Sequence, residues 1–162
     1  MTHINYENES ISFIMGALLR RKKLTALALI EPFNITLRQY VILSRLWHEG
    51  SQSLMALAKR LYADPPSLSR TILLLEKSNL IERERDAVDR RVFTLKLSPS
   101  GRELMQQIKP ILAEYEKQMM AGISAEEISV VTTAMRKMIH NLENIAEAQD
   151  ANQSSEVFGN ER

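Results

Sequence analysis

The sequence predicts a mainly α-helical protein that carries one two-stranded β-ribbon and has long helices toward both ends of the chain. Two observations indicate this class. Apolar residues recur at intervals of three and four along most of the 162 residues, which is the spacing of one helix face. Strict alternation of apolar and polar residues, which is typical of a strand, is confined to residues 81–85 and 92–97.

The first two predicted helices are delimited by capping residues. A helix over about residues 10–30 begins at Ser10, a good N-cap, and ends at the EPFN segment, because proline disfavours helical geometry in the residue before it. A second helix follows Thr36, another N-cap, runs to about Trp47 and is closed by Gly50.

Two shorter helices and the ribbon come next. One helix begins after Ser53, and the next covers about residues 65–78, because Asp64 is a strong N-cap and proline is tolerated in a first turn. The ribbon that follows has its tip at about residues 86–91. Two helices joined by a tight turn and followed by a hairpin have the element order of a winged helix-turn-helix.

Two more helices are predicted in the C-terminal part. The first follows Ser98, contains Pro110, which is expected to kink it, and ends at Gly122. The second opens with a capping box at Ser124 and continues with heptad spacing, as in a coiled-coil seam. Their apolar stripes are Leu104, Ile108, Ile111, Tyr115 and Met119 in the first helix, and Ile128, Val131, Met135, Met138, Leu142 and Ile145 in the second. Residues 149–162 are polar and are expected to be disordered.

The distribution of charge favours a nucleic-acid partner, although the net charge of the chain is only +1. Residues 51–97 carry nine Lys or Arg against six Asp or Glu, a net +3, whereas residues 98–162 carry six against ten, a net −4. Only the basic middle of the chain can usefully face phosphate.

Composition and spacing argue against several other classes. The chain has no cysteine, which excludes disulfides, thiolate zinc sites and thiol redox sensing. His3, His48 and His140 are far apart, so no metal site is expected, and no catalytic triad, glycine-rich phosphate loop or carboxylate pair indicates an enzyme or a cofactor. No apolar run approaches the roughly 20 residues of a membrane span, and the polar N-terminus is unlike a signal peptide, so a cytoplasmic location is expected.

The helix over residues 65–78 has two opposite faces on a helical wheel. An apolar face, expected to pack on the core, consists of Leu68, Ile72 and Leu75. The opposite face holds Pro66, Arg70 and Lys77, with Ser67 and Ser69 beside it near the N-terminal end. Leu73 and Leu74 lie away from the core direction and are expected to pack against a further element. A helix that enters the DNA major groove needs this arrangement, but an ordinary surface helix would also show it.

The ribbon tip, DAVDRR at residues 86–91, is the second candidate for contact with DNA. If the alternation of the following strand extends backward, Arg90 points outward and Arg91 inward. Arg90 is then the better candidate for a narrow minor groove, and Arg91 for a phosphate contact or a local brace, with Asp89 or Asp86 placed to hold a guanidinium. A solvated turn whose charges neutralise one another would explain the same residues.

Several motifs, in order, resemble the MarR family of bacterial winged-helix transcriptional regulators. They are ITLRQYVILSRL (35–46), LAKRLYADPPSLSRTILLLEKSNLIER (57–83) and DAVDRRVFTLKLSPSGREL (86–104), which resemble the opening of the DNA-binding domain, its helix-turn-helix, and its wing with the next helix. By this resemblance Ser67, Ser69 and Arg70 would meet the major groove. The segment Asp89-Arg90-Arg91 matches the wing motif, whose first arginine would enter the minor groove.

The resemblance implies a homodimer that binds a pseudo-palindromic operator in double-stranded DNA, most often as a repressor released by a small aromatic or phenolic ligand. The expected segments are an N-terminal dimerisation helix (1–34), the winged helix-turn-helix (35–98), C-terminal dimerisation helices (99–148) and the tail (149–162). Pocket residues are not predicted; Arg20, Tyr40 and Trp47 are candidates, but a structural role is favoured for each. The alternative is a winged-helix module that binds protein rather than DNA.

Overall fold

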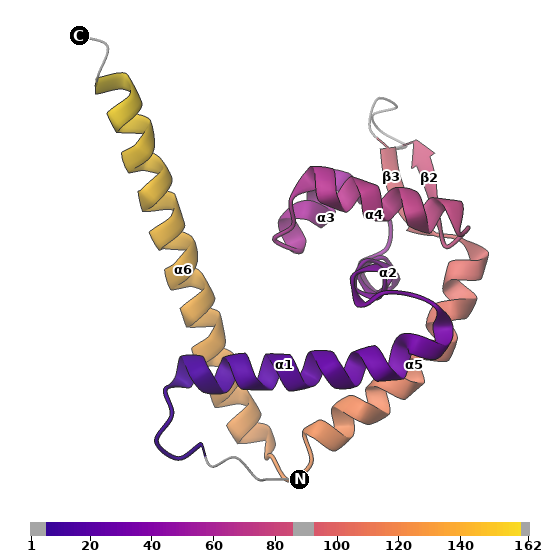
Figure 1. Cartoon of the computed structure of the whole chain (residues 1–162), viewed down its shortest axis with the longest axis horizontal. Coiled ribbons are helices and arrows are strands. Elements are labelled where there is room, and N and C mark those ends of the chain that lie inside the picture. Colours follow the sequence, from indigo (N-terminus) through magenta and orange to yellow (C-terminus); the bar gives the residue numbers. More distant parts are fainter. Residues whose placement is uncertain (1–5, 86–92, 160–162) are drawn as a thin grey trace. The chain divides into compact units, whose positions relative to one another are not determined.

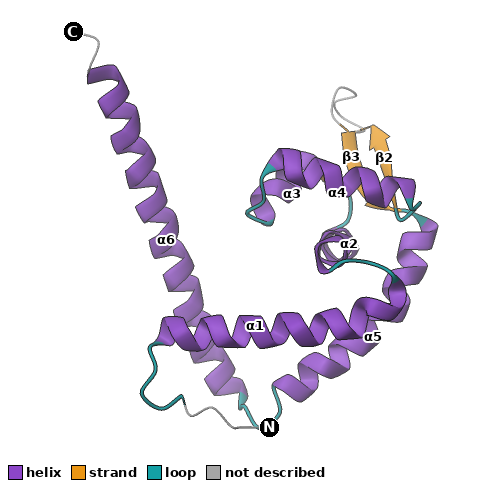
Figure 2. Ribbon diagram, viewed as in Figure 1, coloured by secondary structure: helices purple, strands orange, loops and turns teal. Residues whose placement is uncertain are grey.

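The computed structural model describes residues 6–85 and 93–159, with the side chains of residues 6–85 and 93–149. It is built of helices and one small antiparallel sheet (Figures 1 and 2). Contacts divide the chain into two compact units, Met1–Glu116 and Lys117–Arg162. The division falls later than the boundary expected at residue 98, because the first half of the fifth helix packs into the winged core.

The first unit contains all of the described strands and most of the helices. In chain order its elements are α1 (Ile11–Ile30), the short 3-10 helix η1 (Glu31–Phe33), α2 (Leu37–Glu49), β1 (Gln52–Ser53), α3 (Leu54–Arg60), α4 (Pro65–Lys77), β2 (Ile81–Arg85), β3 (Phe93–Leu97) and α5 (Pro99–Met119), which continues into the second unit. The caps predicted at Ser10, Thr36 and Asp64 are confirmed, and Ser53 is a fourth cap: each of these side chains accepts a hydrogen bond from the backbone N–H three residues on.

The sheet has three strands in the order β1-β3-β2, where the sequence predicts two. The predicted hairpin of β2 and β3 is confirmed, with Ile81 opposite Leu97 and Arg85 opposite Phe93. The extra strand, β1, pairs Gln52 with Leu95. It is only two residues long, too short for any alternation to mark it in the sequence.

The first unit is called the winged unit below. Its core is formed by α2, α3, α4, the sheet and the start of α5. On α4 the predicted apolar face is confirmed, since Leu68, Ile72 and Leu75 are all fully buried. On β3, Leu95 and Leu97 are buried, but Phe93 on the same face lies beyond the edge of the core and is 47% exposed.

The stripe predicted along α5 is only partly correct. Ile108 is fully buried, but so are Gly101 and Met105, which the predicted stripe omits, and Ile111 is 39% exposed. The buried positions follow the interval of four and three that one helix face requires. Burial ends at Ile108 because only the first half of α5 lies on the winged core. Pro110 lies inside α5, which continues past it.

The end of α4, the start of β2 and the start of α5 meet at a closely packed corner, called the α4–β2 corner below. Ser98 is fully buried, and its Oγ donates a hydrogen bond to the carbonyl oxygen of Asn79 (2.6 Å) and accepts one from the N–H of Gly101 (2.9 Å). The Ser98 N–H donates to the carbonyl oxygen of Leu80 (3.1 Å). Asn79 adopts the left-handed conformation (φ 55°) just after the end of α4.

The second unit consists of the end of α5 and α6 (Ala125–Gly159). The predicted capping box is confirmed: the Ser124 N–H donates to Glu127 Oε2 and the Glu127 N–H donates to Ser124 Oγ. The tail expected to be disordered from residue 149 is instead helical to Gly159.

Candidate nucleic-acid interface

The side of α4 opposite the core presents the residues that the sequence singled out. Arg70 and Lys77 are exposed, whereas Ser67 and Ser69, which flank them, are partly buried. The N-terminal end of α4 is set by Asp64, whose Oδ2 accepts from the Ser67 N–H at 2.9 Å. The Ser67 and Ser69 hydroxyls therefore lie in the first turns of the helix, close to the exposed arginine.

Two contacts hold α4 against its neighbours. The turn between α3 and α4 closes through Tyr62, which adopts a left-handed conformation (φ 47°), and the Ala63 N–H donates to the carbonyl oxygen of Ala58 (2.9 Å). At the other end, Arg83 on β2 forms an ion pair with Glu76 on α4. Because β2 begins the wing, this ion pair links the orientation of the wing to that of α4.

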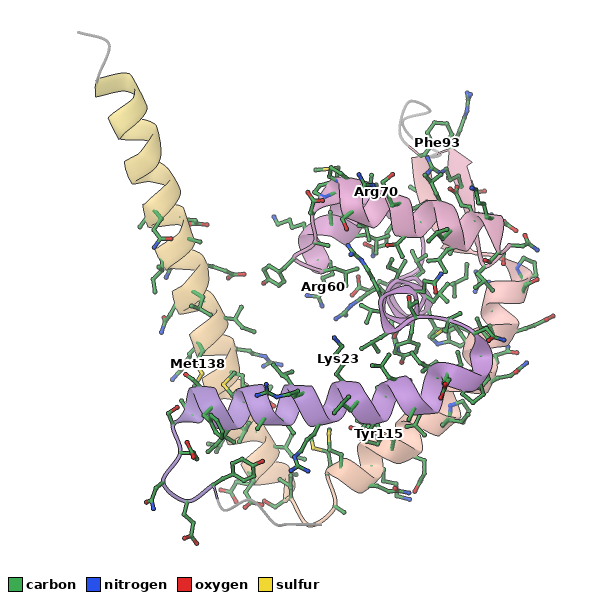
Figure 3. All side chains as sticks on the ribbon, viewed as in Figure 1. Lys23, Arg60, Arg70, Phe93, Tyr115 and Met138 are labelled. Atoms are coloured by element: carbon green, nitrogen blue, oxygen red, sulfur yellow. The ribbon has the colours of Figure 1, made fainter. Side chains whose placement is uncertain are left out.

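The base of the wing is braced by charges across the two strands. Lys96 Nζ on β3 lies 3.0 Å from Glu84 and 3.8 Å from Glu82 on β2, and the contact with Glu84 raises the pKa of Lys96. The Arg85 guanidinium lies over the Phe93 ring, 5.8 Å from its centroid. Figure 3 shows Arg70 on α4 and Phe93 on β3, both on the side of the winged unit that faces away from α1.

The predicted residues at the wing tip, Asp89, Arg90 and Arg91, lie outside the described residues. Their assignment to the minor groove and to phosphate therefore stays a prediction.

A network around Glu49 joins three elements on the surface of the same unit. Glu49, at the end of α2, accepts hydrogen bonds from Arg45 (3.2 Å), from Arg60 on α3 (3.2 Å) and from Gln52 on β1 (3.1 Å). The hydrogen bond from Arg60 is the largest cause of a lowered pKa of the Glu49 carboxyl. Helix α3 is thus held to the end of α2 by charge as well as by apolar packing.

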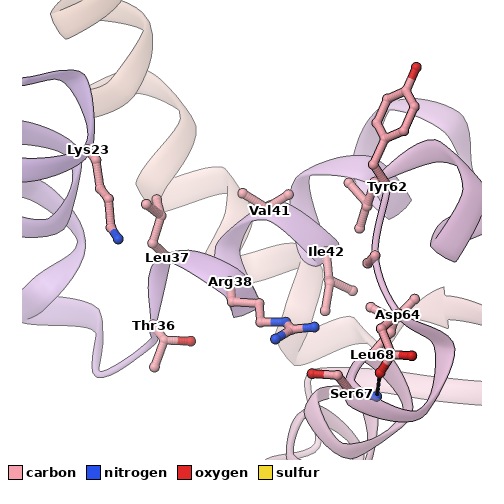
Figure 4. Close-up of a pocket in the computed structure, with 12 residues that line it drawn as sticks. Lys23, Thr36, Leu37, Arg38, Val41, Ile42, Tyr62, Asp64, Ser67 and Leu68 are labelled. Atoms are coloured by element: carbon pink, nitrogen blue, oxygen red, sulfur yellow. Dashed lines mark hydrogen bonds between the residues drawn. The ribbon is translucent and has the colours of Figure 1, made fainter. Parts of the chain in front are cut away.

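A cavity of about 780 Å³ opens between α1, α2 and the turn that leads into α4 (Figure 4). Lys23 of α1 and Arg38 of α2 supply positive charge, and the wall between them is largely apolar. Asp64 and Ser67, which begin α4, complete the lining. Sequence reasoning missed this cavity because its residues come from four separate segments with no shared motif.

A smaller cavity of about 320 Å³ lies between α1, α2 and α5. Tyr40, one of the three candidate pocket residues, lines it, together with Tyr115 and the ion pair of Lys22 with Glu116 (2.9 Å). Arg20 and Trp47 line neither of these two cavities. Trp47 instead lies beneath Lys109 of α5, whose Nζ is 5.2 Å from the ring centroid.

The sequence prediction for the packing of Leu73 and Leu74 of α4 is wrong. The prediction packs them against a further element of the fold, but they are 48% and 55% exposed. Exposed leucines in the middle of this helix are a feature that the wheel alone did not identify, since it showed only that they lie away from the core.

The described ranges contain neither a metal cluster nor a membrane-spanning helix. No group of three or more His, Asp or Glu side chains there is arranged to hold a metal ion. Nor is any helix in the described part of the chain long and apolar enough to cross a membrane.

The chain is similar to known proteins both in the sequence of its DNA-binding segment and in its fold. The family model of the MarR family matches residues 35–93. The structure of S. aureus MepR in complex with DNA is 26% identical in sequence and aligns with a TM-score of 0.77 over 84% of this chain and 99% of that one. The structure of an E. coli MarR mutant with operator DNA is 18% identical and has the same fold, with a TM-score of 0.70 over 85% and 99% of the two chains.

A third similar structure is that of Bordetella bronchiseptica BpsR, a protein whose DNA binding is regulated by 6-hydroxynicotinic acid. It is 23% identical and has the same fold, with a TM-score of 0.69 over 84% of this chain and 97% of that one. The family match covers α2, α3, α4 and β2 and ends at Phe93, the first residue of β3, so it includes the first two motifs and the beginning of the third. The motifs, the fold and the family match therefore confirm the resemblance to the MarR family, which the family model shows over residues 35–93.

Proposed function

We propose that this protein is a DNA-binding transcriptional regulator in which α4 is the recognition helix. The observation that carries the proposal is the division of α4 into two faces. Its core face is fully buried, while Arg70 and Lys77 project from the opposite face within the family's winged helix-turn-helix. DNA complexes of the similar MepR and MarR structures support the same assignment.

The chemistry of this face fits a major groove. An arginine can form two hydrogen bonds with guanine O6 and N7, and serine hydroxyls can hydrogen-bond to base edges or phosphates. Lys77, the last residue of α4, suits a phosphate contact. The proposal assigns Arg70 to base recognition and Ser67, Ser69 and Lys77 to positioning, with Arg90 and its neighbours added from the wing.

We also propose that the active species is a homodimer. Both α1 and α6 expose apolar side chains; on the predicted α6 seam, Leu142 is 65% and Ile145 is 53% exposed. Large apolar side chains repeated at heptad spacing on an exposed helix mark an association surface. A two-fold dimer would present two copies of α4 to half-sites separated by about one turn of DNA.

DNA binding is tested by a mobility-shift titration of the full chain on the DNA that flanks its own gene, at 50 and 200 mM salt. Affinity should fall steeply with salt, because each neutralised phosphate contributes a slope of about −0.9 in the logarithmic plot. Arg70→Ala should weaken specific binding by about 1–3 kcal/mol. Arg136→Ala, which removes the same charge from α6, is the matched control and should leave binding unchanged. A wild-type chain that shifts neither this DNA nor any selected duplex would refute the proposal.

We further propose that a small aromatic acid in the 780 Å³ cavity regulates DNA binding. The cavity lies in the size range of small-molecule sites, and it joins an apolar wall to two cationic side chains, Lys23 and Arg38. It also contacts Asp64 and Ser67, so an occupant would touch the cap and the first turn of the recognition helix. Ligand and DNA affinities would then be coupled reciprocally.

The probe for this site is 6-hydroxynicotinic acid, together with benzoate and uncharged benzamide as a matched pair. The carboxylates should release DNA, benzamide should not, and Arg38→Gln should raise the concentration needed by about tenfold. Arg136→Gln serves as the charge control. Equal responses to benzoate and benzamide would contradict the assignment of the cations to a carboxylate.

A further inference from the structure

Leu73 and Leu74 place two large apolar side chains in the middle of the proposed recognition helix. The other three apolar residues of the helix body, Leu68, Ile72 and Leu75, are fully buried, whereas these two are 48% and 55% exposed. They are therefore not needed for the core of the described unit, and their exposure is unfavourable in water.

Their positions on α4 relate them to Arg70 rather than to the core. At about 100° per residue, Leu73 and Leu74 lie about 60° and 40° from Arg70 on the helix surface, on opposite sides of it and one turn further along. Lys77 follows on the same face. The exposed face of α4 is thus an apolar pair set between two cations.

This pattern of charge indicates what covers the leucines. An apolar protein surface laid over them would also cover Arg70 and Lys77, and burying unpaired cations is strongly unfavourable. A DNA major groove meets both demands, because phosphates line its edges and thymine presents an apolar 5-methyl group on its floor. Leucine has no donor or acceptor, so the methyl group is the only feature of a base edge that it can recognise favourably.

We propose that Leu73 and Leu74 contact thymine 5-methyl groups on the two sides of the base that Arg70 contacts. The inference rests on the proposed function, and it adds the class of base that this chain prefers. The operator half-site should contain thymines, on either strand, next to the position contacted by Arg70. Replacement of those thymines by cytosine should weaken binding even though Arg70 keeps its partner.

The test compares thymine with uracil, which differs only by the 5-methyl group. The probe is a duplex selected from a random pool by the full-length protein, with uracil then placed at individual thymine positions. Uracil at the contacted positions should weaken binding by about fourfold per methyl group. In Leu73→Ala or Leu74→Ala the same replacement should change affinity by less than about twofold, because the contact is already lost. Uracil outside the selected site is the control on the DNA.

Because both leucines are exposed, the alanine variants should fold normally, and a thermal melt of each should match the wild type. Val130→Ala, which removes an exposed apolar side chain from α6, is the protein control and should bind both duplexes like the wild type. If no duplex is enriched from the pool, the proposed DNA-binding function itself fails. If a duplex is enriched but uracil has no effect, or has the same effect in the leucine variants as in the wild type, DNA binding stands and the thymine contact is refuted. An altered elution volume of the leucine variants with unchanged DNA affinity would likewise refute it and assign the pair to a protein contact.

Discussion

The winged unit and α6 both carry regular apolar patterns, but they use them in different ways. Every residue of the described hydrophobic core lies between residues 30 and 108, in the winged unit. Among the described residues from 117 to 149, none is buried, and Val131, Leu142 and Ile145 of the predicted seam are at least half exposed. A stripe of the same spacing is therefore a closed core in one region and an open surface in the other.

The difference teaches where each region obtains its stability. The winged unit folds around contacts made within one chain, so its stability should not depend on protein concentration. An isolated helix with an exposed apolar seam gains little from propensity alone, and its stability should come from association. Substitutions in the two regions should thus differ in size and also in their dependence on concentration.

The largest expected effect is that of Gly101→Ala, which tests whether the winged unit is closed by backbone packing. A Cβ at Gly101 would overlap the carbonyl oxygen of Leu80 and lie 3.0 Å from its carbonyl carbon. The start of α5 must then move away from the α4–β2 corner, and the free energy of unfolding should fall by about 3 kcal/mol. Urea denaturation at two protein concentrations would measure this loss.

Ser100→Ala is the matched control for that substitution, since it adds no atoms at an exposed position in the same turn of α5. Its effect should stay within about 0.5 kcal/mol. If Gly101→Ala were equally mild, or if its effect depended on protein concentration, the corner would not be part of a self-contained core.

The elements of the winged unit were predictable because capping residues and periodicity are local signals. Ser10, Thr36, Ser53 and Asp64 each mark a helix start in the sequence, and each accepts the expected backbone hydrogen bond. The charged face of α4 was predictable for the same reason. What the pattern of a single helix cannot show is which of its apolar side chains finds a neighbour.

The errors arise where tertiary contacts decide. The third strand consists of two residues whose partner lies more than 40 positions away, so it leaves no local pattern. The inward face of α5 includes Gly101 because a backbone carbonyl lies there, and a glycine does not register as part of an apolar stripe. Leu73 and Leu74 were assigned a neighbour within the chain, but they are about half exposed among the described residues, and the cavity of about 780 Å³ collects residues from separate helices.

A second effect, intermediate for each substituted side chain, is expected from Leu142→Ala and Ile145→Ala on α6. If these side chains are covered by a second copy, each truncation should weaken the dimer by about 2 kcal/mol per buried side chain, while a monomer would hardly be affected. Analytical ultracentrifugation of the double variant should show dissociation at micromolar concentrations, and its melting temperature should depend on concentration more strongly than that of the wild type. Lys137→Ala, on the far side of the helix from the seam, should leave both properties unchanged. A double variant that stays dimeric would place the association surface elsewhere.

The smallest expected effect is a difference between the winged unit and α6 in how their stability depends on pH. The pKa of Glu49 is lowered chiefly by its hydrogen bond from Arg60, and the pKa of Glu127 is lowered chiefly by its hydrogen bond from the Ser124 backbone. Both carboxyls release their protons more readily in the folded chain than in the unfolded one, so each stabilises the fold above the usual glutamate pKa of 4.5 and loses that contribution as the pH falls through the lowered value. Glu49→Gln should flatten the acid side of the stability curve of the winged unit, because Glu49 joins α2, α3 and β1. Glu127→Gln should change little, since glutamine can still complete a capping box and only the first turn of α6 depends on it. Unfolding midpoints in urea measured from pH 3 to 7 would compare the two variants, and an equal flattening by both would mean that the cap of α6 is coupled to the winged core.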